Sequence, residues 1–319
     1  MNPYSGETFI GFLVQLFWRL ISFFQGNIGF EDIVSDEIQI IILCGIATSA
    51  AFLGTFLVLR KMTMLANALS HTILLGVIIV YIFTTGHVAD HNTSINIKAL
   101  LLGSLITGLA TTFLTEFLTK TAGLQEDASI GIVFTSLFAV GIILATLLTR
   151  NTHIGTEVVM GNVDALQLAD CKLVLIVLGI NLVCFILFFK EFKITTFDQN
   201  LAKSLGISPL VFNYLLMLQV SATCIGSFRA VGVLMVLAFL TGPPLTARLL
   251  THSLKKMLFF AVGIGWTASL IGVAVSRHLL SVQGIALSTG GVVVCAIAAL
   301  FIAVLIITEI KTSLKKYSL

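Results

Sequence analysis

The residues best suited to chemistry lie within one apolar segment, Met62–Phe83. At a rise of ~1.5 Å per residue, a histidine of this segment would lie near the middle of a ~30 Å hydrocarbon core. Polar side chains are costly at that depth, so they predict either a substrate path or hydrogen bonds to a neighbouring helix. A helix would place four of them on one face, at i, i+4, i+7 and i+8: Thr63, Asn67, Ser70 and His71.

The composition identifies an integral membrane protein. Of 319 residues, 57% are hydrophobic and only 10% are charged, whereas soluble domains carry about 25% charged residues. Long unbroken apolar runs favour helices over the alternating pattern of a membrane β-barrel. We therefore predict an all-α fold, a polytopic transmembrane helical bundle of about 8–10 spans.

Basic residues orient these spans. They gather near Arg60, Lys120 and Lys190, and again at the C-terminal end, which the positive-inside rule places in the cytoplasm. Phe9–Phe24 is interrupted by Gln15 and Arg19, so it is either an interfacial helix or an extra span. The clear spans are 38–59, 62–83, 99–119, 129–149, 171–189, 209–228, 230–250, 257–280 and 290–308.

A second informative stretch is the basic cytoplasmic segment 190–208, in which 196–206 has the pattern of a short amphipathic helix. Asp198 or Thr196 can cap its start, and Gly206 can end it. An apolar edge on such a helix fits either a groove on a partner protein or the membrane surface. The edge is formed by residues at i, i+4 and i+8, namely Phe197, Leu201 and Leu205.

The sequence motifs that ATP binding, hydrolysis and ion-driven transport require are missing from the sequence. The chain has no GxxxxGK[ST] phosphate loop and no HExxH, GxSxG or SxxK motif, which argues against an intramembrane enzyme. Carboxylates are nearly missing from the middle of the spans, which argues against a secondary carrier driven by protons or sodium. Loop residues with possible metal ligands are expected to be solvated: His87, Asp90, His91, His153 and Glu157.

Four sequence blocks, in order along the membrane core, resemble the permeases of the zinc/manganese/iron class of ABC transporters. RKMTMLANALSHTILLG matches a basic pair followed by Asp-Ala-Leu-Ser-His, and another block matches the family's Phe-Asp-x-x-x-Ala-x-x-x-Gly-Ile loop. The blocks are Arg60–Gly76, Gly123–Leu144, Thr196–Ile207 and Arg229–Leu250.

The resemblance implies an importer subunit of the bacterial inner membrane that binds no cofactor and is not an enzyme. It would translocate Mn²⁺, Zn²⁺ or Fe²⁺ with a second permease chain, cytoplasmic ABC ATPase subunits that hydrolyse ATP, and an extracytoplasmic metal-binding protein. The alternative is an ATP-independent secondary metal-ion carrier; a nucleic-acid partner is not expected. The domains would be an extracytoplasmic or interfacial preamble (1–37), the transmembrane permease domain (38–310) and a cytoplasmic basic tail (311–319).

The resemblance also implies roles for single residues. His71 matches a metal-path ligand, with Asn67, Ser70 and Thr63 beside it, but Asn67 stands where the family has Asp. A neutral oxygen is a weaker ligand for a divalent cation, so either the site is weak or a distinct partner permease supplies the carboxylate, which favours a heterodimer. The residues expected to couple to the ATPase are Phe197, Asp198, Leu201, Ala202, Leu205 and Gly206.

Three further residues carry structural expectations. Asp127 matches an acidic position at the inner start of a span, where a negative charge suits the helix N-terminus and acts as a cap. Pro243 and Pro244 each remove a backbone donor, so we expect a helix break or hinge there, or else a fixed kink.

Overall fold

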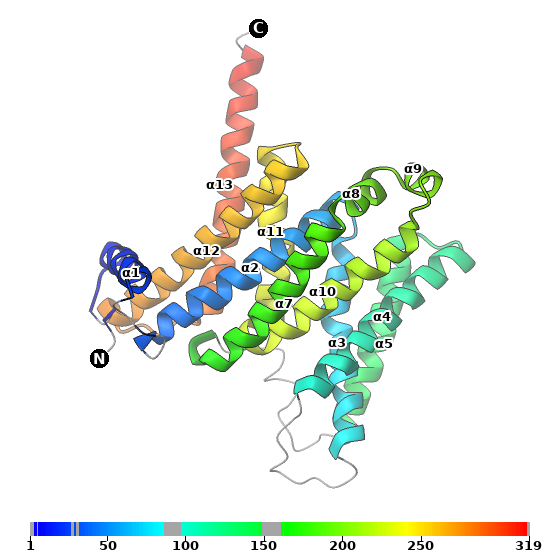
Figure 1. Ribbon diagram of the computed structural model, residues 1–319, viewed down its shortest axis with the longest axis horizontal. Coiled ribbons are helices and arrows are strands. Elements are labelled where there is room, and N and C mark those ends of the chain that lie inside the picture. Colours follow the sequence, from blue (N-terminus) through cyan, green and yellow to red (C-terminus); the bar gives the residue numbers. More distant parts are fainter. Residues whose placement is uncertain are drawn as a thin grey trace. The chain divides into compact units, whose positions relative to one another are not determined.

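The computed structural model of the chain describes residues 3–4, 6–26, 29, 32–85, 97–148, 161 and 163–317 (Figure 1). All the elements in these ranges are helices, which confirms the predicted fold class. Two of them, α3 (Thr63–Thr85) and α4 (Ile97–Thr121), have 23 and 25 residues. Seven other described helices are long and apolar enough to cross a membrane: α2 (Ser35–Leu59), α5 (Glu126–Leu148), α7 (Leu168–Leu187), α10 (Pro209–Val231), α11 (Val233–Leu250), α12 (Leu254–Gln283) and α13 (Thr289–Tyr317).

The fold consists of two compact units. The first unit contains Met1–Thr55, Gly161–Leu178 and Ala230–Leu319, and the second contains Phe56–Met160 and Gly179–Arg229. Because chain segments far apart in sequence build each unit, neither is a contiguous domain.

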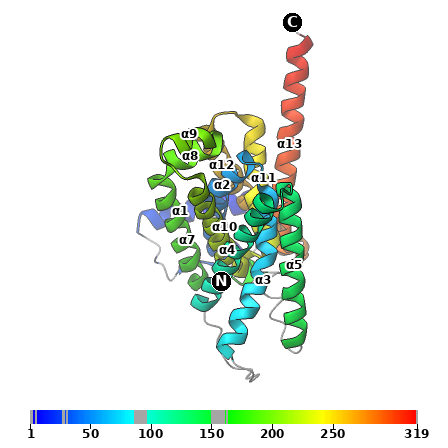
Figure 2. The same cartoon turned by 90° about the vertical axis from the view of Figure 1, so that its right-hand side faces the viewer.

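In the first unit, α11, α12 and α13 pack against one another. Small residues permit this close packing, as is common between membrane helices. A Cβ atom on Gly242 would collide with Ile297, and one on Gly272 would collide with Val293. α13 continues past the ends of α11 and α12 (Figure 2), so the predicted tail at 311–319 begins as a continuation of this helix.

The helix α1 (Phe9–Phe24) belongs to the first unit and packs against α12. Its 16 residues span ~24 Å, which is shorter than a ~30 Å hydrocarbon core and favours an interfacial helix over an extra span. Arg19 forms an ion pair with Glu37 at the start of α2, and the Tyr4 hydroxyl donates a hydrogen bond to the same carboxylate at 2.7 Å. Burial, followed by this hydrogen bond, raises the pKa of Tyr4.

In the second unit, α3, α4 and α5 pack side by side (Figure 1). The hydroxyl of Thr111 on α4 donates a hydrogen bond to that of Thr72 on α3 at 3.0 Å. Asn181 on α7 donates one to Thr223 on α10 at 2.7 Å. Such polar contacts hold membrane helices together where no hydrophobic driving force between helices exists.

The structure differs from the sequence-based expectation at two connections. Two short helices, α8 (Phe189–Phe197) and α9 (Gln199–Ser204), fill most of the segment expected to be a loop with one helix. The break between α10 and α11 lies at Gly232, whose φ of 80° is readily adopted only by glycine, and not around Arg229.

Candidate functional site

The polar residues predicted on one face of 62–83 do lie on a helix, α3. Ser70 is buried, and its hydroxyl donates a hydrogen bond to the carbonyl oxygen of Asn67 at 2.7 Å. Thr63, Asn67 and His71 are partly exposed. Within the described part of the chain, the side chains of Asn67 and His71 form no hydrogen bond. The amide oxygen of Asn67 and the ring nitrogens of His71 are therefore available to coordinate a metal ion.

Two phenylalanines of α5 hold the imidazole of His71. The ring centroids of Phe134 and Phe138 both lie 5.4 Å from that of His71, at interplanar angles of 45° and 64°. Distances of this kind are typical of favourable aromatic contacts. The contact fixes the ring on the side of α3 that faces α5 and removes part of its water.

The described residues contain no group of three or more His, Cys, Asp or Glu side chains that could hold a metal ion. His71 would therefore be a single ligand within this part of the chain, and a cation bound there would need further ligand atoms. The loop residues considered above, at 87, 90, 91, 153 and 157, lie outside the described ranges.

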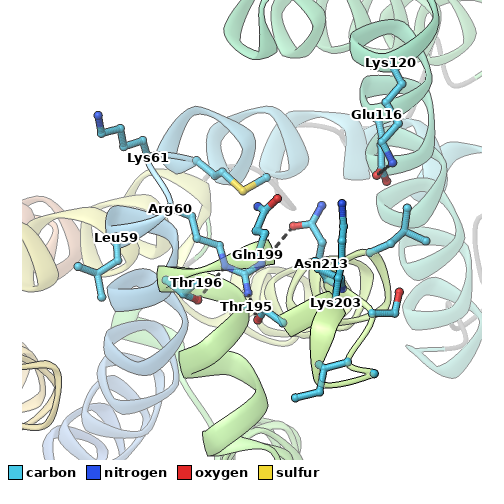
Figure 3. Close-up of a pocket in the computed structure, with 16 residues that line it drawn as sticks. Leu59, Arg60, Lys61, Glu116, Lys120, Thr195, Thr196, Gln199, Lys203 and Asn213 are labelled. Atoms are coloured by element: carbon cyan, nitrogen blue, oxygen red, sulfur yellow. Dashed lines mark hydrogen bonds and ion pairs between the residues drawn. The ribbon is translucent and has the colours of Figure 1, made fainter. Parts of the chain in front are cut away.

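The helix α8 is fixed to the second unit by Arg60, which follows the last residue of α2. Its guanidinium donates three hydrogen bonds: to Thr196 Oγ1 at 3.0 Å, to Thr195 Oγ1 at 2.9 Å and to Asn213 Oδ1 at 3.4 Å (Figure 3). Burial lowers the pKa of Arg60 to about 10. One side chain thus joins the end of α2, the end of α8 and the start of α10.

An aromatic cluster reinforces this attachment. Phe192 of α8 is buried, and its ring lies 5.7 Å from that of Phe56 on α2 and 5.5 Å from that of Phe212 on α10. Phe188 packs edge-on against Phe212 at 5.8 Å. Aromatic pairs in such geometry contribute ~0.5–1.5 kcal/mol each beyond their burial, so α8 is a rigid element.

The segment after α8 turns sharply at Asp198. This residue ends α8 and caps α9, and its carboxylate accepts hydrogen bonds from the backbone N–H groups of Asn200 at 3.0 Å and Leu201 at 2.9 Å. Gly206 follows α9 with φ of 78°, and Ile207 N donates to Ala202 O at 2.9 Å, as in a Schellman ending. Of the two expected caps, Asp198 is therefore confirmed.

The apolar edge predicted for this segment is exposed although it is divided between α8 and α9. Ala202 is buried. The exposed fractions are 60% for Phe197, 47% for Leu201 and 58% for Leu205. A buried anchoring face and an exposed apolar face are what a docking element requires; the coupling role itself stays a prediction.

The two prolines lie inside α11, which runs without interruption from Val233 to Leu250. Pro244 lacks the N–H that would bond to the carbonyl of Leu240, four residues earlier. Gly54 of α2 lies against that carbonyl, and a Cβ atom there would collide with it. The prolines thus mark a close approach of α2 and α11, and their role as a hinge stays a prediction.

Asp127 is the second residue of α5 and is exposed. It lies in the first helical turn, where a carboxylate interacts favourably with the helix dipole. The cap assigned to it remains a prediction.

Sequence comparison identifies the family. The model of the ABC 3 transport family matches residues 36–308. The chain belongs to the ABC 3 transport family. It is therefore a multi-pass subunit of the bacterial inner membrane that serves transport and is not an enzyme.

Three proteins of known name are similar to this chain over most of their length. A probable metal transport system membrane protein of Chlamydia trachomatis is 40% identical over 96% of this chain and 94% of its own. The manganese transport system membrane protein MntD of Bacillus subtilis is 37% identical over 77% of this chain and 85% of its own. A chain of PsaBC from Streptococcus pneumoniae, solved in complex with a Fab, superposes with a TM-score of 0.67 at 28% identity, covering 84% of this chain and 88% of its own.

Sequence reasoning missed two parts of the site in this ABC 3 permease. Arg60 was recognised only as half of a basic pair, since its bonds to Thr195 and Thr196 connect residues more than 130 positions apart. Phe134 and Phe138 lie within the sequence block Gly123–Leu144. Their i, i+4 spacing, which places both rings on one helix face, is the signal that could have singled them out.

Proposed function

We propose that this chain is a permease subunit of an ABC importer that carries a divalent transition metal, Mn²⁺, Zn²⁺ or Fe²⁺, across the inner membrane. The family match over residues 36–308 carries the proposal. It is supported by the relatives named for metal and manganese transport, which align with most of this chain. An imidazole ligand favours these metals over Mg²⁺ and Ca²⁺, which prefer oxygen.

In this proposal, the face of α3 with Thr63, Asn67, Ser70 and His71 lines the metal path. The free ring nitrogens of His71 support this role, because they can coordinate a passing cation without breaking an existing bond. A path site must bind weakly enough to release its ion, and a single imidazole with a neutral amide oxygen meets that need.

A separate ATPase energises transport by docking on α8–α9. The rigid attachment of α8 through Arg60 and Phe192 supports this role, because movement of the exposed edge would reach α2 and α10 directly. A second permease completes the path. We propose a distinct chain for it, since Asn67 brings no charge and an anionic ligand from a partner would supply it.

Metal uptake combined with purification tests the function. Cells that express the chain together with the proposed ATPase, second permease and metal-binding protein should accumulate ⁵⁴Mn, ⁶⁵Zn or ⁵⁵Fe. The tagged chain should co-purify with the ATPase. Uptake should stop when the phosphate-loop lysine of that ATPase is replaced. Uptake by the purified chain alone in liposomes, driven by an ion gradient, would instead identify a secondary carrier.

A further inference from the structure

A large cavity opens beside Arg60 in the second unit. Its volume is about 770 Å³, within the range of small-molecule sites. Its walls come from the end of α2, the end of α4, α8–α9 and the start of α10 (Figure 3). It is distinct from the face of α3 that carries His71, which does not line it.

The cavity is strongly basic. Four cationic side chains line it, Arg60, Lys61, Lys120 and Lys203, against a single carboxylate, Glu116. That carboxylate already forms an ion pair with Lys120 at 2.6 Å. Among the described residues, the other three cations have no ion pair, so the cavity carries an uncompensated positive charge.

Arg60 is the cation whose charge most needs compensation. All three groups that accept its hydrogen bonds are neutral, and its surroundings are desolvated enough to lower its pKa. Even a partly buried charge costs free energy when it has no counter-ion. An anion in the cavity would remove part of this cost, and Lys61 and Lys203 would complete its coordination from the cavity walls.

The cavity lies at one end of several long apolar helices. Leu59 ends α2, Lys120 is in the last turn of α4 and Pro209 begins α10, so the walls are the ends of membrane helices. The positive-inside rule places these ends on the cytoplasmic side. Basic pockets between helices at this level bind anionic headgroups.

We propose that this cavity binds the phosphate group of an anionic phospholipid of the inner leaflet. Apolar side chains beside the cations fit the glycerol and the first methylenes of such a lipid: Leu59, Met62, Ile207 and Leu210. A free phosphate ion would gain nothing from these side chains. The bound lipid would brace α8–α9 against the ends of α2 and α4.

Native mass spectrometry of the full chain with its co-purified subunits tests the proposal. The probes are phosphatidylglycerol, phosphatidylcholine as the zwitterionic reference, and inorganic phosphate. The test variant is Lys61→Asn with Lys203→Gln, because asparagine tolerates the φ of 61° at position 61. The matched control is Lys255→Gln with Lys256→Gln, two exposed lysines at the start of α12 that do not line the cavity.

The wild type should retain phosphatidylglycerol in preference to phosphatidylcholine. The test variant should bind it at least tenfold more weakly, given the contribution of each lysine near an anionic surface, while the control should bind it like the wild type. Equal retention by wild type and test variant would overturn the site. Displacement of phosphatidylglycerol by millimolar inorganic phosphate would overturn the phospholipid as the ligand.

Discussion

At the scale of single residues, His71 combines a free imidazole with an apolar setting. Phe134 and Phe138 restrict the ring without bonding to its nitrogens. A restricted ligand loses less conformational freedom when it coordinates an ion, which favours binding. Asn67, one turn earlier, adds a carbonyl oxygen but no charge.

Replacing His71 tests the path. His71→Ala should lower metal uptake at least tenfold, because no other His, Cys, Asp or Glu cluster replaces the ligand within the described residues. The complex should still assemble, since the side chain makes no hydrogen bond to any described residue. Radioactive metal uptake and subunit recovery measure this. His252→Ala, an exposed histidine between α11 and α12, is the control; normal uptake by His71→Ala would remove the histidine from the path.

Introducing a carboxylate tests the neutral side chain at position 67. Asn67→Asp adds an anionic oxygen one helical turn from His71, so we expect the apparent affinity for metal to rise about tenfold and its metal preference to change. Concentration-dependent uptake of Mn²⁺, Zn²⁺ and Fe²⁺ measures both. Identical uptake curves for all three metals would indicate that a partner chain already supplies the charge.

At the scale of elements, the second unit depends on the attachment of α8, and the first unit depends on the close approach of α2 to α11. α8 is fixed by a partly buried arginine and an aromatic cluster, while α9 depends on one cap and one glycine. α2 approaches α11 at Gly54, where a proline has left a carbonyl without its helical donor. These positions tolerate little change, although none of them is charged except Arg60 and Asp198.

Two substitutions of Asp198, the cap of α9, distinguish the contribution of its hydrogen bonds from that of its charge. Asp198→Ala removes two hydrogen bonds and should cost about 1 kcal/mol of local stability, which loosens the docking edge and lowers transport per ATP hydrolysed. Asp198→Asn keeps the cap and should retain coupling. The transport rate and the ATPase rate, both measured in liposomes, give the number of ions transported per ATP hydrolysed. A loss of coupling in both variants would show that the charge, and not the cap, matters.

The approach of α2 to α11 predicts opposite effects for two similar substitutions. Gly54→Ala should destabilise the protein by about 1–3 kcal/mol through overpacking against the Leu240 carbonyl. Gly263→Ala on α12 meets no atom within 4 Å, so it should be neutral or stabilising by up to ~1 kcal/mol. Thermal unfolding in detergent compares them, and equal melting temperatures would contradict the close approach.

At the scale of the whole molecule, the proposed metal path asks for more ligands than the described residues supply. Among the described residues, no His, Cys, Asp or Glu cluster accompanies His71, and the proposed second permease would supply the further ligands. Two differently tagged copies of this chain, co-expressed with the proposed second permease, should each recover that permease and not one another. Recovery of both tags together would establish a homodimer.

Most of the fold could be predicted from the sequence, because burial in lipid demands long apolar helices. The segment around Phe192 could not, since its helix depends on contacts with Phe56 and Phe212, which lie 136 and 20 residues away in the sequence. The polar face of α3 followed from helical spacing alone. The hydrogen bonds of Arg60 and the cavity beside it depend on how segments distant in sequence pack together, and a local sequence pattern does not predict such packing.

The bonds of Arg60 also determine how the second unit responds to ionic strength. Thr195, Thr196 and Asn213 carry no charge, so dissolved salt does not screen an attraction between opposite charges there. Lys61 and Lys203 are exposed, and their attraction to an anion fades beyond the ~8 Å Debye length of physiological saline. Concentrated salt would therefore release a bound anion while α8 stays attached to α2 and α10.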